Sequence, residues 1–212
     1  MGYQSLPMVG ITGFIMGLVL TLQSRPTVAQ FGAGSWIPTM VGLTIIREMG
    51  PIITALIFAG KIGSSIGTEL GSMRVTEQID AVEVSGTNPF KYLVVTWVLA
   101  TTLMLPVLTV LADGIGLFAS YVGINTRGTT TLTLFVNNIL SGLTFCDVLP
   151  AFIKTFFFGF AIGLIGCYKG YYAGKGTEGV GQAANSAVVV SSLVIFILDL
   201  LAVQITGLLG IN

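Results

Sequence analysis

The chain has 212 residues, of which 53% are hydrophobic and only 8% are charged. A soluble globular domain carries roughly 25% charged residues, so this composition excludes a soluble domain and indicates an integral membrane protein. Lysine plus arginine and aspartate plus glutamate number nine each, so no basic field exists to hold nucleic acid. There is no histidine, and Cys146 and Cys167 lack metal-ligand spacing, which excludes the usual zinc sites and histidine-based triads.

Five apolar segments approach or exceed the roughly 20 residues that a helix needs to cross a hydrocarbon core of about 30 Å. In chain order they are residues 8–22, 36–62, 92–121, 148–168 and 187–209. None alternates polar and apolar residues over about ten positions, as outer-membrane strands do. The sequence therefore predicts an all-α integral membrane protein, a single domain over residues 1–212 with about five transmembrane helices.

The first and third of these segments are unusual in length or composition. Residues 8–22 are short for a membrane span, whereas residues 92–121 are long and contain Pro106. A proline inside a helix removes a backbone donor and clashes with the preceding turn. The sequence therefore predicts a truncated first span and an irregular middle in the third.

Charged residues lie inside four of the apolar segments: Arg47 and Glu48 in the second, Asp113 in the third, Lys154 in the fourth and Asp199 in the fifth. Ionisable groups at such depth cost several kcal/mol unless they are paired or hydrated, so Arg47, Glu48, Lys154 and Asp199 are candidates for function. The alternative is that they only pair with one another between helices. Because Arg47 and Glu48 are adjacent, their side chains point about 100° apart on a helix, and each needs its own partner.

The longest charged stretch lies between the second and third segments, where residues 74–84 are expected to form a short helix outside the membrane core. Val75, Ile79 and Val82 form one apolar stripe at helical spacing. Thr76 is expected to cap the start of this helix, and Gly86 is expected to follow its end.

The opposite face of that short helix is acidic, because it carries Glu77, Asp80 and Glu83. Helices that lie on a membrane surface are usually basic, to match anionic lipid. The acidic face therefore favours a protein partner, and a solvated helix on the headgroups is the alternative.

Loop cations predict the orientation, because lysine and arginine concentrate on the cytoplasmic side. Five lie in or beside the loops that join the second segment to the third and the fourth to the fifth: Lys61, Arg74, Lys91, Lys169 and Lys175. Only Arg25 and Arg127 lie in the other two loops. The chain is therefore expected to enter the membrane from the cytoplasm and to end outside at Asn212.

Small residues recur along two segments at spacings that allow close backbone packing. They are Ala55, Ala59, Gly63, Gly67 and Gly71, then Gly159, Gly163, Gly166, Gly170 and Gly174. Contact within one subunit and contact across a dimer are two open alternatives for these rows.

The run REMGPIITALIFAGKIG that starts at Arg47, followed by TELGSMRVTEQIDA up to Ala81, closely resembles the MlaE family. These are permeases of Mla and Mce-type lipid ABC transporters. The likeness begins at the pattern G-x-x-x-G-x-x-L-x-L-Q from Gly13 to Gln23. It continues through ANSAVVVSS to Leu198-Asp199, and so covers nearly the whole chain.

The resemblance implies a homodimer of permeases in the bacterial inner membrane, with the C terminus on the periplasmic side. It implies two copies of a separate ATPase, which hold ATP and Mg, and a periplasmic Mce-domain protein that exchanges phospholipid or a related lipid. The chain itself is then a transport subunit without catalytic residues, metal or cofactor. The family's cytoplasmic coupling helix falls on the short acidic helix, which makes these the candidate ATPase-coupling residues: Arg74, Thr76, Glu77, Gln78, Asp80 and Glu83.

We hypothesise that Arg47 lies at a lipid-accessible cavity near the dimer axis with Glu48 beside it, and that Lys154 and Asp199 line this cavity or form a counter-pair. The guanidinium of Arg47 has a planar fork suited to phosphate. Two other functions stay open: an ATP-independent channel or secondary transporter, and a non-transporting membrane scaffold. Gly60-Lys61 and Gly174-Lys175 lack the remainder of a nucleotide-binding loop, so any ATP hydrolysis is expected on a partner chain.

Overall fold

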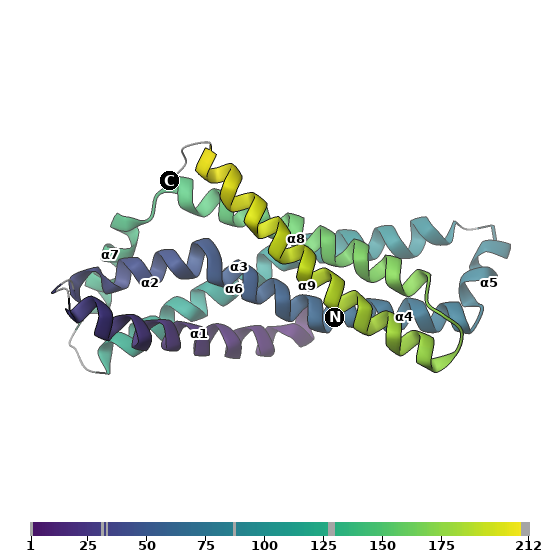
Figure 1. Ribbon diagram of the computed structural model, residues 1–212, viewed down its shortest axis with the longest axis horizontal. Helices are drawn as coiled ribbons and strands as arrows, with labels where there is room; N and C mark the ends of the chain where they lie inside the picture. Colours follow the sequence, from purple (N-terminus) through teal and green to yellow (C-terminus); the bar gives the residue numbers. More distant parts are fainter. Residues whose placement is uncertain (1, 31, 33, 87, 127–129, 209–212) are drawn as a thin grey trace.

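The computed structural model describes residues 2–30, 32, 34–86, 88–126 and 130–208, and the described part is helical without strands (Figure 1). Five stretches are long and apolar enough to cross a membrane: Ser5–Val28, Ile37–Val75, Phe90–Asn125, Phe145–Tyr171 and Gly176–Leu208. The predicted all-α membrane fold is confirmed.

The helices extend beyond the apolar runs that predicted them. Their bounds are α1 Gly2–Gln30, η1 Gly34–Trp36, α2 Ile37–Thr44, η2 Ile45–Met49, α3 Gly50–Phe58, η3 Ala59–Gly63, α4 Ser64–Val75, α5 Gln78–Val84, η4 Phe90–Val94, α6 Val95–Asn125, α7 Leu132–Gly142, α8 Phe145–Tyr171 and α9 Gly176–Leu208. The prediction of a short first span is wrong, because α1 continues through Pro7 and Pro26. Each of these prolines removes one backbone hydrogen bond, but the helix continues through both.

The third span is also more regular than the sequence predicted. Pro106 lies inside the unbroken helix α6 and is buried. Helix α6 packs against α1 and α8 along its length. Membrane helices tolerate proline where neighbouring helices enclose it, and that packing keeps α6 continuous.

The second span is helical without interruption from Ile37 to Val75, but its winding changes twice, at the π-helical turns η2 and η3. In η2 the N–H of Gly50 donates to the carbonyl of Ile45, five residues earlier. Pro51 follows at once and has no N–H to donate, so the ordinary α-helical bond to Arg47 is absent. The wider turn accommodates this loss, and Gly50-Pro51 thus alters the pitch of the helix without breaking it.

The rows of small residues pack within the chain. Gly166 lies against Gly63 and Ile66, and Gly170 lies against Gly67 and Leu70, so α8 approaches the η3–α4 segment closely. Helix α9 also meets this segment, where Gly67 faces Ala184. Figure 1 shows α8 and α9 running alongside α4. The structure therefore favours contact within one subunit for these glycines.

Helices α1 and α6 approach most closely at Gly17, where an added Cβ would overlap with the backbone of Gly116. Gly17→Ala is therefore expected to lower the free energy of unfolding by roughly 1–3 kcal/mol or more, because the two backbones must separate. Gly114→Ala is the matched control, since a Cβ there meets nothing within 4 Å. Thermal unfolding in detergent measures both variants. Equal melting temperatures would contradict this packing.

The short helix between the second and third spans begins later than predicted. Helix α4 continues to Val75, and α5 begins at Gln78 after a turn in which Glu77 has φ +58°. Thr76 does not cap α5, because its Oγ1 donates to the carbonyl of Ser72, four residues back in α4. The prediction of that cap is wrong, because a threonine at the end of one helix can donate its hydroxyl hydrogen to a backbone carbonyl of the preceding turn.

Other features of the short helix agree with the sequence. Ile79 is fully buried, whereas Glu77, Asp80 and Glu83 are exposed. Arg74 and Asp80 form an ion pair of 2.6 Å that joins α4 to α5. The helix ends at Val84, and Gly86 follows with φ +81°, as expected of a helix stop.

Candidate functional site

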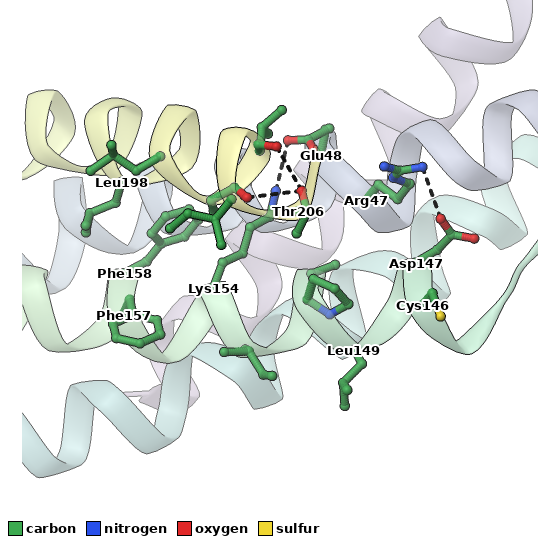
Figure 2. Close-up of a pocket in the computed structure, with 17 residues that line it drawn as sticks. Arg47, Glu48, Cys146, Asp147, Leu149, Lys154, Phe157, Phe158, Leu198 and Thr206 are labelled. Atoms are coloured by element: carbon green, nitrogen blue, oxygen red, sulfur yellow. Dashed lines mark hydrogen bonds and ion pairs between the residues drawn. The ribbon is translucent and has the colours of Figure 1, made fainter. Parts of the chain in front are cut away.

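A cavity of about 450 Å³ opens between η2, the first half of α8 and the last part of α9 (Figure 2). Arg47, Glu48, Asp147 and Lys154 supply its charged lining. The remaining wall is mostly apolar, with Cys146, Leu149, Pro150, Ala151, Ile153, Phe157, Phe158, Leu198, Leu201, Ala202, Val203, Ile205 and Thr206. The cavity thus has an ionic part and an apolar part.

Arg47 pairs with a residue that the sequence analysis missed. Its Nη1 lies 3.0 Å from Oδ1 of Asp147, at the start of α8. The other oxygen of Asp147 accepts from the backbone N–H of Thr144 at 3.0 Å and from its hydroxyl at 2.5 Å. The bond from the Thr144 backbone, together with a bond from the backbone N–H of Asp147 to the Thr144 side chain, forms a capping box. The pattern Thr-x-x-Asp before an apolar run is the sequence signal for it.

Lys154 joins three of the membrane spans. Its Nζ donates to Oε2 of Glu48 and to Oδ1 of Asp199, each at 2.9 Å. The three residues come from α8, η2 and α9. Only 7% of the Lys154 side chain is exposed, so the two carboxylates supply the compensation that a buried ammonium requires.

The structure brings together the four charged residues that the sequence singled out. Arg47 and Glu48 each have a separate partner of opposite charge, as their adjacency on a helix predicted. Lys154 and Asp199 form a counter-pair, and Lys154 also lines the cavity, whereas Asp199 is not among its lining residues. Helix α5, with the candidate coupling residues, lies at the far end of the molecule from α7 and from the start of α8 (Figure 1).

Asp113 is a further charged residue near the site. A Cβ at position 50 would overlap with its Oδ1, so only glycine fits beside Asp113 in this helix. That oxygen is buried and has no hydrogen-bond partner within the part of the chain that the structure describes. The Gly50-Pro51 pair therefore serves two steric demands, the change of pitch and the approach of α6.

The family model described as permease MlaE matches residues 1–205. The chain belongs to the MlaE permease family. It is 42% identical to a probable ABC transporter permease protein of Rickettsia typhi, over 96% of this chain and 79% of that protein. It is 37% identical to a probable ABC transporter permease protein of Synechocystis, over 92% and 74%. It is 34% identical to the intermembrane phospholipid transport system permease protein MlaE of Haemophilus influenzae, over 97% and 79%.

These matches confirm the resemblance seen in the sequence. The MlaE relatives bear the names of permease proteins, which agrees with the prediction that this chain is a transport subunit and not an enzyme. With its five membrane spans, the chain is a multi-pass membrane permease.

Proposed function

We propose that this chain is the inner-membrane subunit of an ABC transporter that moves phospholipid or a related lipid. The cavity carries the argument, because it combines charged groups at one side with apolar walls in a membrane-spanning region. A phospholipid has the same division between headgroup and acyl chains. The name of the Haemophilus relative, an intermembrane phospholipid transport permease, supports a lipid substrate.

Arg47 is the group in this cavity best suited to a phosphate. Its guanidinium carries five N–H donors in a planar fork, and 35% of the side chain is exposed. A volume of about 450 Å³ lies within the roughly 300–1,000 Å³ of ordinary ligand sites, so it suits a headgroup with the first part of its acyl chains. In this proposal Glu48 and Lys154 complete the ionic wall, and Asp199 holds Lys154 in place.

Transport requires partners in this proposal. A separate ATPase binds ATP and Mg and docks on α5 and the residues before it. A second copy of the chain completes the membrane part, and a periplasmic Mce-domain protein exchanges lipid with it. The exposed acidic groups of α5 offer a surface complementary to a basic groove on the ATPase.

Affinity purification in mild detergent with mass spectrometry tests this assembly. The unmodified chain should bring down an ATPase, an Mce-domain protein and phospholipid. Replacing Glu77 and Asp80 with lysine should weaken ATPase binding by about tenfold or more, because like charges would face the basic groove. Unchanged co-purification and ATPase activity of the variant would exclude docking on that face.

The orientation predicted from the loop cations has its own test. Cys146 is exposed at the start of α8, and Gly174 is exposed in the loop after α8, beside Lys175. A membrane-impermeant thiol reagent should label Cys146 only from the periplasm. Cysteine at position 174, in a chain with Cys146→Ser, should be labelled only from the cytoplasm. The reverse pattern would invert the topology. Arg127, one of the two cations expected in the periplasmic loops, lies outside the described residues.

A further inference from the structure

The ionic part of the cavity presents one positive and one negative side chain. Arg47 and Glu48 are each 35% exposed, whereas Lys154, Asp147 and Asp199 are 7%, 9% and 14% exposed. The buried members of the cluster hold the two exposed ones, Asp147 from one side and Lys154 from the other. A ligand in the cavity therefore meets a cation and an anion that follow each other in the sequence.

The ion pairs of the cluster contain two cations and three carboxylates: Arg47 and Lys154 against Asp147, Asp199 and Glu48. A ligand with a net negative charge would increase this excess in a region of low dielectric, where like charges repel more strongly than in water. A ligand with both charges would leave the total unchanged. The electrostatics of the site thus disfavour net-anionic headgroups.

We propose that the site selects phospholipids whose headgroup is zwitterionic, with the phosphodiester on Arg47 and a primary ammonium on Glu48. This inference rests on the proposed lipid transport and adds the class of headgroup. Neighbouring positions on a helix diverge by about 100°, so the two side chains reach different ends of a ligand. Figure 2 shows them turned toward different partners, with Arg47 toward Asp147 and Glu48 toward Lys154.

Hydrogen-bond capacity favours a primary ammonium over a quaternary one. An ionised carboxylate has about four acceptor positions, and Lys154 uses one of them on Oε2 of Glu48. An ethanolamine headgroup can donate N–H bonds to the remaining positions, whereas a choline headgroup has no N–H. The expected order of affinity is therefore phosphatidylethanolamine, then phosphatidylcholine, then phosphatidylglycerol.

The test equilibrates the purified transporter complex with micelles that contain equal amounts of these three lipids, and measures the retained lipids by mass spectrometry. The unmodified complex should retain phosphatidylethanolamine over phosphatidylglycerol by about tenfold. Glu48→Gln should lower that ratio about fivefold to tenfold, since it removes a charge-assisted hydrogen bond. Glu48→Asp should restore part of the preference. Glu69→Gln, the same change at an exposed position on α4, should leave the ratio unchanged.

Two outcomes separate this inference from the proposed function. Retention of all three lipids in equal amounts by the unmodified complex would overturn headgroup selection and leave lipid transport standing. Complete lack of bound phospholipid would contradict the lipid substrate itself. Even if Glu48→Gln proves unstable, the ratio of the lipids that the unmodified complex retains still tests headgroup selection. A folded Glu48→Gln variant with an unchanged ratio would overturn the role of Glu48.

Discussion

Replacing Lys154 with methionine is expected to lower the free energy of unfolding by roughly 3–5 kcal/mol, because removing one partner of a buried ion pair leaves charge without compensation. Both carboxylates that accept from Lys154, those of Glu48 and Asp199, would then face each other across two helices. The loss should appear as a lower melting temperature and a lower yield of assembled protein. Lys175→Met, at an exposed position, is the matched control and should change neither.

A triple variant makes this prediction specific to charge. Lys154→Met combined with Glu48→Gln and Asp199→Asn removes all three charges and should recover most of the lost stability, since apolar or neutral replacement of a buried ion cluster is often tolerated. If the triple variant is as unstable as Lys154→Met alone, the loss comes from packing, and the bridging role of Lys154 is wrong.

Arg47→Ala is expected to reduce co-purified phospholipid and transport by about tenfold while the complex stays assembled. A tenfold change corresponds to about 1.4 kcal/mol, close to the lower end of the roughly 1.5–3 kcal/mol for a hydrogen bond to a charged group. Stability should change little, because Thr144 still donates two hydrogen bonds to Asp147 when the arginine is absent. Bound lipid and melting temperature should be measured on the same sample.

The control for Arg47→Ala is Lys91→Ala, which removes an exposed cation from η4. It should keep both the lipid content and the melting temperature. Normal lipid content in Arg47→Ala, together with a large loss of stability, would show that Arg47 serves only its ion pair with Asp147.

Hydrophobicity and charge placement predicted much of this molecule from the sequence. Apolar length located five spans, and the angle between neighbouring helical positions correctly required separate partners for Arg47 and Glu48. Both rules depend only on local geometry. They could not identify Asp147, because its contact with Arg47 joins residues that are 100 positions apart. Only the capping pattern at Thr144 marked Asp147 as part of an ordered helix start.

Tertiary packing decided the features that the sequence predicted wrongly. Pro106 is a helix breaker in isolation, but α1 and α8 pack against α6 and keep it continuous. Thr76 is a good capping residue in isolation, but α4 extends to Val75, and the Thr76 hydroxyl donates a hydrogen bond to a carbonyl of α4 instead. The π-helical turn at Arg47 and Glu48 depends on Pro51 together with the close approach of Asp113 to Gly50, which local propensity does not describe.

Movement of labelled phospholipid in liposomes tests the central proposal most directly. The liposomes contain this chain alone, this chain with its ATPase, or both with hydrolysable ATP. The account predicts movement above background only when the chain, the ATPase and ATP are all present. Equal movement with the chain alone would contradict it and would indicate an ATP-independent channel or secondary transporter.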